Sequence, residues 1–352
     1  MEKSDKKELI HKLSRQQRLQ RHEWHTLLTS LDDEEQELIR REAAATAVAH
    51  FGHGIYIRGL IEISSYCRNN CRYCGLRCSN LNAERYRLTR EEILECCRQG
   101  AALGFNTFVL QGGEDNRQSD GWIAETINAI HARYPDKAIT LSVGERSDEA
   151  YRTFRQAGTT RYLLRHETRN DGHYSHLHPS NMSSSNRRRC LDTLKREGYQ
   201  TGSGMMIGSP GQTTEHLIDD LEYLDELRPE MIGIGPFIPA AGTPFAEEPA
   251  GSIQETVRII SLLRLRHPNA LIPATTALAS LHPDGRKQAI LAGANVVMPN
   301  LSPTAVRSKY SIYDNKASTG CESAEAIEKL EKELNSIGYH IDYSRGDHKQ
   351  PE

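Results

Sequence analysis

From residue 56 onward, short apolar runs alternate eight times with longer amphipathic segments. Short runs rich in branched and aromatic residues predict strands, whereas apolar residues spaced three and four apart predict helices. The predicted strands are 56–64, 107–111, 139–143, 161–165, 201–207, 231–235, 271–275 and 294–298, and the predicted helices are 90–103, 122–134, 148–157, 186–198, 213–227, 254–266 and 286–291. This alternation, over about 250 residues, predicts an α/β fold and a complete (β/α)8 barrel of the TIM type. A doubly wound open sheet is the structural alternative.

Two segments flank the predicted barrel. Residues 1–55 place leucines and isoleucines at helical intervals among charges, and Leu31-Asp32-Asp33-Glu34 is typical of a capped helix start. We therefore expect a helical lead-in over 1–55, the barrel over 56–310 and a C-terminal helical extension over 311–352. The polar end, residues 344–352, is expected to fray.

Composition narrows the class of protein. No window of 18 residues is continuously apolar, so we expect no membrane span. The net charge is −3, from 44 Lys and Arg against 47 Asp and Glu, which disfavours a general nucleic-acid binder. Eight cysteines without a visible export signal favour metal or redox chemistry over a disulfide scaffold, and they predict a cytoplasmic protein.

Polar and small residues gather directly after several of the predicted strands. In a barrel these positions form the C-terminal rim, where catalytic groups lie. Glycine and proline also punctuate ordinary turns, but glutamate, threonine and glutamine at many strand ends favour a site. The rim segments are 111–114, 144–145, 166–168, 208–212, 236–237 and 275–276.

The most specific feature is a group of cysteines directly after the first predicted strand. Cys67, Cys71 and Cys74 follow a Cx3Cx2C spacing, so one loop can wrap three thiolates around a metal centre. Thiolates select iron–sulfur clusters or zinc. A structural zinc site takes a fourth ligand and usually a second CxxC pair, which this sequence lacks. An iron–sulfur cluster is the better prediction, and three thiolates leave one iron of a 4Fe-4S cube open to a chelating small molecule.

Cys78 keeps a second interpretation open, because a fourth thiolate would close the cube and leave a carrier of electrons or clusters. The ferredoxin run is Cx2Cx2Cx3CP, whereas here the first spacing is longer and Ser79 stands in place of the proline. We therefore predict three ligands, with Cys78 spare. Cys96, Cys97 and Cys190 lie within predicted helices and are expected to pack as small apolar groups.

The Cx3Cx2C run with an aromatic residue before its third cysteine, Tyr73, resembles the signature of the radical S-adenosylmethionine (SAM) enzymes. The resemblance implies two cofactors, one 4Fe-4S cluster and SAM, with Tyr73 at the cofactor site. It implies that the open iron binds the amino and carboxylate groups of SAM. It further implies a low-potential electron donor as a partner, since one electron cleaves a C–S bond to give the 5′-deoxyadenosyl radical.

Other residues match SAM-binding positions of the same family. Gly112, Gly113 and Glu114 resemble the glycine-rich turn that these enzymes place after the second strand, against the methionine amino group. Glycine suits a turn whose backbone approaches a ligand closely. The resemblance assigns Glu167 to the ribose hydroxyls of SAM. It assigns Arg187 to the SAM carboxylate, which a guanidinium can bind with two parallel hydrogen bonds.

Several longer segments resemble one branch of this superfamily, the maturases of FeFe hydrogenase, between about 56 and 310. The segments are 164–168, 208–213, 233–239, 272–276 and 294–300. This likeness implies a small-molecule substrate, an iron complex of cysteine, carbon monoxide and cyanide, and other hydrogenase maturases as partners. The candidate substrate residues are Gln111, Ser142, Arg165, Thr275, Thr276 and Met298.

Related activities remain as alternatives, because biotin synthases and methylornithine synthases share the barrel and the cluster but fewer of these segments. Many of the maturases also hold a second cluster on three cysteines near the C-terminus. Between residues 310 and 338 this sequence has only Cys321, so we predict no second cluster.

Overall fold

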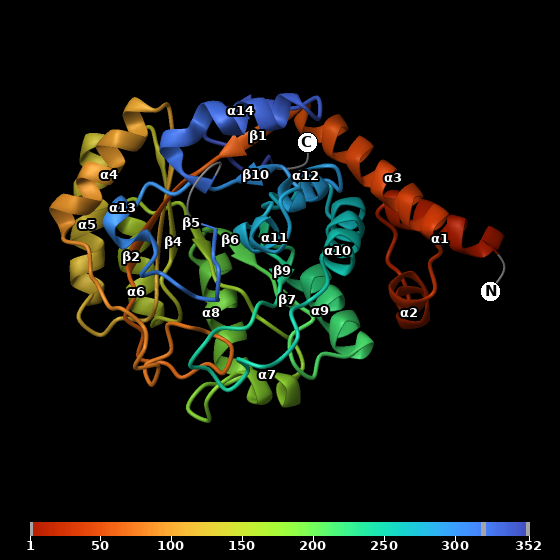
Figure 1. Ribbon diagram of the computed structural model, residues 1–352, viewed down its shortest axis with the longest axis horizontal. Helices are drawn as coiled ribbons and strands as arrows, with labels where there is room; N and C mark the ends of the chain where they lie inside the picture. Colours follow the sequence, from red (N-terminus) through yellow and green to blue (C-terminus); the bar gives the residue numbers. More distant parts are fainter. Residues whose placement is uncertain (1–2, 318–321, 350–352) are drawn as a thin grey trace.

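The computed structural model of the chain describes residues 3–317 and 322–349. Its centre is a six-stranded parallel sheet with the order β2-β3-β4-β5-β6-β8 (Figure 1). These strands are β2 (Gly59–Ser64), β3 (Thr107–Gly112), β4 (Ala138–Ser142), β5 (Arg161–Leu163), β6 (Gln200–Ser203) and β8 (Met231–Ile232). All six residues of β2 are buried, as expected of a parallel strand covered on both faces. The α/β fold and the parallel sheet agree with the prediction.

Shorter strands extend this arrangement. β1 (Gly54–Ile57) lies between β10 (Val296–Val297) and β11 (His340–Asp342), and β7 (Met206–Ile207) pairs with β9 (Gly235–Pro236). Isolated parallel bridges join Met231 to Leu271, Pro273 to Val296, and Leu60 to Asn300.

Four of the predicted strands differ from their predicted form. The first is divided into β1 and β2, which pair with different neighbours. The fifth is divided at Gly204, whose φ is +151° and where a Cβ would meet the carbonyl oxygen of Gly233 at 1.9 Å. The sixth, 231–235, is divided into β8 and β9, which belong to different sheets. The seventh, 271–275, makes only isolated bridges, and Pro273 at its middle has no N–H to donate to a ladder.

Helices cover the outside of the sheet (Figure 1). Side-chain oxygens of Ser or Thr cap six of them, each accepting a backbone N–H from the first turn, as the N-cap preference predicts. The six are α4 (Arg90–Ala102), α5 (Asp120–Arg133), α6 (Asp148–Gln156), α8 (Ser184–Arg196), α9 (Thr214–Leu227) and α10 (Ile253–Arg266). Shorter helices are α7 (Asp171–Leu177), α11 (Thr276–Leu281), α12 (Gly285–Ile290), α13 (Thr304–Arg307), the 3-10 turn η2 (Ala324–Ala326) and α14 (Ile327–Asn335).

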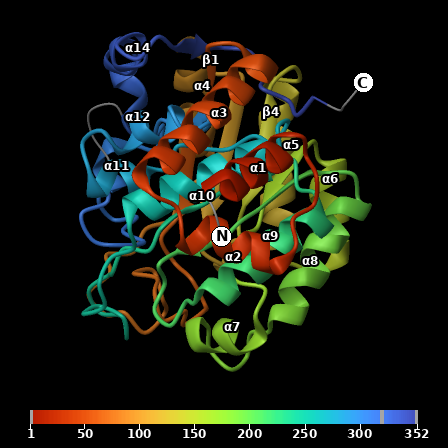
Figure 2. The same cartoon turned by 90° about the vertical axis from the view of Figure 1, so that its right-hand side faces the viewer.

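The N-terminal segment is helical, with α1 (Lys3–Ser14), α2 (Arg21–Thr29) and α3 (Asp33–Phe51). These helices lie over α9 and α10 (Figure 2). Asp32 caps α3 by accepting the backbone N–H of Glu35 at 2.9 Å, as predicted. Trp24 of α2 is 1% exposed, so this segment shares the core of the molecule.

The prediction of a frayed polar end is wrong for residues 344–349. Arg161 lies at the start of β5 and is fully buried, so its guanidinium needs partners. It donates to the carbonyl oxygen of Arg345 at 2.8 Å and to the carboxylate of Asp347 at 2.7 Å. The C-terminal segment therefore contains α14, β11 and an ordered tail against the start of the sheet. No helix in the described part of the chain is both long and apolar enough to cross a membrane.

Candidate active site

The three cysteines lie on a long loop between β2 and α4, residues 65–89, which its own arginine holds together. Arg85 donates to the carbonyl oxygens of Ser65 at 2.5 Å, Leu76 at 2.9 Å and Arg77 at 2.8 Å. The side chain of Asn80 adds a hydrogen bond to the carbonyl oxygen of Gly75 at 2.9 Å. Buried hydrogen bonds of this number fix a loop that has no regular structure.

Cys67, Cys71 and Cys74 are free and partly buried on this loop. Burial raises the pKa of Cys71 well above its usual range, and the neighbouring Cys74 and Cys67 thiols add to the rise. Burial likewise raises the pKa of Cys74 to about 12. These thiols influence each other, and a bound metal would deprotonate them despite the burial.

The donor set suits an iron–sulfur cube better than a single ion. Among the residues that the structure describes, no three His, Cys, Asp or Glu side chains converge to hold one metal ion. A cube binds each thiolate through a different iron, so its ligands need not converge on one point. The backbone N–H groups of Asn69 and Glu114 donate hydrogen bonds to the Cys67 sulfur and lower its pKa. Burial has the larger effect and raises this pKa. Hydrogen bonds from backbone N–H groups to the sulfurs of a cluster help to set its reduction potential.

Cys78 differs from these three cysteines in being exposed to solvent. We expect Cys78→Ala to keep the full iron content of the reconstituted protein, about four irons per chain. Iron and sulfide analysis after anaerobic reconstitution measures this. Loss of the cluster in this variant would instead identify Cys78 as a fourth ligand.

Tyr73 is positioned by a histidine that the sequence did not single out. His178 is 2% exposed, and its Nδ1 lies 3.0 Å from the carbonyl oxygen of Tyr174. A carbonyl only accepts, so Nδ1 carries the proton and Nε2 accepts from the hydroxyl of Tyr73 at 3.3 Å. The rings of Tyr73 and His178 also meet edge to face at 5.5 Å. A neutral His178 therefore orients the aromatic residue between the last two cysteines.

This neutral histidine predicts a loss of stability in acid. Burial, with help from the charge of Arg187, lowers the pKa of His178 to about 3. In the unfolded chain the histidine side chain has a pKa near 6.5. Between about pH 3 and about pH 6.5 the unfolded chain therefore binds a proton that the folded chain does not bind. The stabilisation is complete above about pH 6.5 and falls as the pH decreases, by about 2 kcal/mol at pH 5. Denaturant unfolding of wild type and His178→Asn at several pH values measures this, and parallel pH profiles would contradict it.

The glycine-rich turn packs directly against the cysteine loop. A Cβ on Gly113 would lie 2.4 Å from the carbonyl oxygen of Tyr66 and 2.7 Å from the Cβ of Cys67. The carboxylate of Glu114 forms an ion pair with Arg68 at 2.8 Å and accepts a hydrogen bond from the backbone N–H of Glu145 at 2.9 Å. A Cβ on Gly112, at the end of β3, would have more room, because its nearest neighbour would lie 3.2 Å away. The glycine-rich turn therefore supports the cysteine loop at Tyr66 and Cys67.

Glu167 has two features that point to a ligand. Its φ is +65°, a left-handed conformation that costs a non-glycine residue about 1 kcal/mol or more. Its Oε1 accepts from Nε of Arg165 at 3.0 Å, while its buried Oε2 has no partner among the described residues. A buried carboxylate oxygen without a donor is costly, so the site suits a ligand that brings hydroxyl groups. Glu167 also affects the pKa of Cys71 and Tyr73, which indicates that it lies near the cysteine loop.

Arg187 is buried beside the same loop. It donates to Glu145 at 2.6 Å and to the carbonyl oxygen of Arg165 at 2.5 Å. Asn186 holds the other oxygen of Glu145 at 2.5 Å. Sequence reasoning missed Glu145 as the residue that orients Arg187, because only the folded chain brings the end of β4 to α8.

The candidate substrate residues have different surroundings. Gln111 and Ser142 are register partners on β3 and β4, and Gln111 lies 3.4 Å from the hydroxyl of Tyr310. The buried hydroxyl of Thr275 has no partner among the described residues, whereas that of Thr276 donates to Glu322 at 2.8 Å. Met298 packs on the apolar cluster formed by Tyr56, Met231, Leu271 and Val296.

The sequence analysis did not predict a buried ion pair that lies beside Gln111 and Tyr310. Glu62 on β2 is fully buried, accepts from Asn300 at 2.9 Å and forms a close ion pair with Lys316. Lys316 also lies 5.2 Å from the ring centre of Tyr310. A glutamate within an otherwise apolar strand could have indicated a buried charge. Its partner could not be predicted, because Lys316 lies 254 residues away in the sequence. Cys321 lies outside the described residues, so the prediction about a second cluster remains a prediction.

Comparison with known proteins is consistent with this geometry. Residues 61–224 match the family model described as the radical SAM superfamily. The FeFe hydrogenase maturase subunit HydE of Thermotoga maritima is 45% identical over 267 residues, which are 76% of each chain. A 3-methylornithine synthase of Methanosarcina acetivorans is 29% identical, over 89% of this chain and 87% of that one. The crystal structure of methylornithine synthase (PylB) superposes with a TM-score of 0.84 at 27% identity, covering 95% of this chain and 97% of that chain.

Proposed function

Because the chain belongs to the radical SAM superfamily and, within it, to the family of the hydrogenase maturase HydE, we propose that it matures FeFe hydrogenase by acting on a small iron complex. The family's cofactors are a 4Fe-4S cluster and SAM. One observation supports the site most strongly. Cys67, Cys71 and Cys74 share one partly buried loop, and Glu167, in the segment after β5, has a buried Oε2 without a partner among the described residues.

We propose that Cys67, Cys71 and Cys74 hold the cluster and leave one iron open for SAM. When bound and reduced, the cluster supplies the electron that cleaves a C–S bond of SAM to give the 5′-deoxyadenosyl radical. On this proposal Glu167 accepts hydrogen bonds from the ribose hydroxyls, and the Gly113 turn approaches the methionine end. Arg187, held by Glu145, provides positive charge for the SAM carboxylate.

The substrate we propose is a small, anionic iron complex of cysteine, carbon monoxide and cyanide. The remaining guanidinium N–H groups of Arg165, whose Nε is bound to Glu167, and the hydroxyl of Thr275, which has no partner among the described residues, offer hydrogen-bond donors to such a ligand. Gln111 and Ser142, side by side on β3 and β4, offer further polar contacts. On this proposal the partners are the other hydrogenase maturases, which deliver the complex and receive the product.

A methylornithine synthase activity is the second candidate, favoured by the TM-score of 0.84 to that enzyme. A substrate derived from lysine carries an ammonium group and needs a free carboxylate. The carboxylate of Glu62 is already neutralised by Lys316. This ion pair favours the anionic complex over an amino-acid amine.

We also propose that the bridges at Met231, Pro273 and Leu60 close the sheet into a complete barrel over residues 56–310. In this arrangement 1–55 is a helical lead-in and 311–352 an extension without a second cluster. The cytoplasm is the compartment we propose, since its reducing conditions keep such thiols available.

Production of 5′-deoxyadenosine tests the proposed chemistry. Anaerobically reconstituted protein receives dithionite and SAM, and the nucleoside is measured by chromatography. We expect cleavage of SAM and an EPR signal of the reduced cluster that changes when SAM binds. Faster cleavage on addition of a cysteine-bound iron carbonyl cyanide complex, but not of lysine, would identify the substrate class. Absence of cleavage in protein with a full cluster would reject the proposal.

A further inference from the structure

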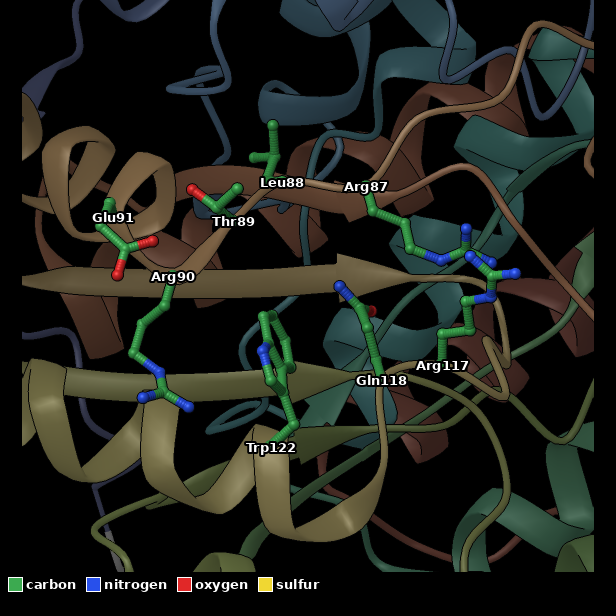
Figure 3. A pocket seen from close by; sticks show the side chains of 8 residues that line it. All are labelled: Arg87, Leu88, Thr89, Arg90, Glu91, Arg117, Gln118 and Trp122. Atoms are coloured by element: carbon green, nitrogen blue, oxygen red, sulfur yellow. The ribbon is translucent and has the colours of Figure 1, made fainter.

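Two surface pockets differ in their relation to the active site. The first, of about 350 Å³, lies between the starts of α4 and α5, and two of its arginines are already paired, with Asp115 and with Glu125 (Figure 3). The second, of about 460 Å³, is lined by α9 and by Arg169 and Asn170, which follow Glu167 by two and three residues. This pocket leaves the segment after Glu167 without close packing on one side, so hydrogen bonds have to fix its conformation.

The start of this segment is fixed by the end of β6. Glu167 donates its backbone N–H to the carbonyl oxygen of Gly204 at 3.0 Å. The hydroxyl oxygen of Ser203 accepts the backbone N–H of His166 at 3.3 Å and lies 2.9 Å from Nδ1 of the same histidine. Glu167 has a φ of +65°, and a non-glycine residue keeps such a conformation only when its surroundings impose it.

The other side of the segment is held by one aspartate of α9. Asp220 is fully buried, and its Oδ1 accepts the backbone N–H of Arg169 at 2.5 Å. The same oxygen lies 3.3 Å from Nε2 of His166, which is itself 1% exposed. One carboxylate oxygen therefore contacts the residue before Glu167 and the second residue after it. Asp219, the preceding residue of α9, pairs instead with Arg21 at 2.9 Å.

We propose that Asp220 is a positioning residue that sets the conformation of Glu167 and thereby the affinity for SAM. The inference rests on the proposed function, in which Glu167 accepts the ribose hydroxyls. Asp220 acts through His166 and Arg169, and it holds the left-handed turn in place before SAM arrives. A carboxylate fixed in advance pays less conformational entropy when the ligand binds. Without Asp220 the strained turn can relax, and the carboxylate of Glu167 then moves away from its binding position.

Binding of SAM to the reconstituted protein tests the proposal without catalysis. The cluster is left oxidised, so no SAM is cleaved during calorimetry. We expect Asp220→Ala to raise the Kd for SAM by about tenfold. Asp220→Asn should stay within about threefold of wild type, because its amide oxygen can still accept from Arg169. Iron content and circular dichroism should equal those of wild type. The matched control is Asp219→Ala on the same helix, which should bind SAM as wild type does.

A double-mutant cycle separates positioning of Glu167 from general support of the fold. Glu167→Gly leaves no carboxylate to orient, so adding Asp220→Ala to it should leave the Kd for SAM unchanged. A further tenfold rise in that background would overturn the proposal. So would an Asp220→Ala protein that binds SAM as wild type does, or an Asp220→Asn protein as weak as Asp220→Ala.

Ser203→Ala provides a second test that stands even if Asp220→Ala does not fold. It removes the other side-chain contact of His166. We expect a rise in the Kd for SAM of about threefold in wild type and none in the Glu167→Gly background. An equal rise in both backgrounds would contradict positioning through Glu167. Equal Kd values for wild type and Glu167→Gly would instead overturn the ribose assignment of the proposed function.

Discussion

Cys71→Ala is expected to abolish both the cluster and the cleavage of SAM. Cys71 is the central cysteine of the three, and the pKa of its thiol is raised by burial and by both neighbours. With two thiolates left, a cube would have two irons without protein ligands, and we expect the iron content to fall from about four per chain to near zero. Iron and sulfide analysis, visible absorbance and 5′-deoxyadenosine production measure the result.

The control for this variant is Cys78→Ala, which removes an exposed thiol from the same loop. Both proteins should have similar circular dichroism, because the loop is held by Arg85 and Asn80 rather than by the thiols. A Cys71→Ala protein with its full iron content and normal SAM cleavage would show that the ligand assignment is incorrect. Loss of folding in the variant would be visible in the dichroism and is separable from loss of iron.

The parts of the fold that local sequence determines were predictable. Asp32 lies directly before a helical pattern, and its side chain caps α3 as its position indicates. The six Ser and Thr caps follow the same local rule. The cysteine spacing is equally local, since a single loop carries all three thiols. These features depend on neighbours in the sequence, so the printed sequence contains the information.

Other features depend on residues that are distant in the sequence. Lys316 reaches Glu62, and Asp347 reaches Arg161, only because the C-terminal segment returns to the sheet. No local pattern pairs such residues, so the ion pair and the ordered tail were missed. His178 was missed for a related reason: its role follows from the tautomer that the carbonyl oxygen of Tyr174 imposes. Division of the fifth strand at Gly204 required the position of Gly233 on a neighbouring segment.

Glu167→Gln is expected to weaken SAM binding while leaving the cluster intact. The substitution keeps the size of the side chain but removes the charge that would accept two ribose hydroxyl hydrogen bonds. Hydrogen bonds to a charged group contribute about 1.5–3 kcal/mol, so the Kd for SAM should rise by about tenfold to a hundredfold. The iron content should equal that of wild type, because Glu167 supplies no thiolate. Equilibrium binding of SAM, followed by the EPR change, measures the Kd.

Glu167→Gly separates the carboxylate from the backbone turn it occupies. Glycine adopts the φ of +65° without strain, so the variant keeps the turn and removes the side chain. If Glu167 mattered only for the turn, this variant would bind SAM as well as wild type does, and the ribose assignment would be wrong. We expect weak SAM binding in Glu167→Gly as well as in Glu167→Gln. The reason is that the unpartnered Oε2, and not the conformation, is the feature that a hydroxyl-bearing ligand would satisfy.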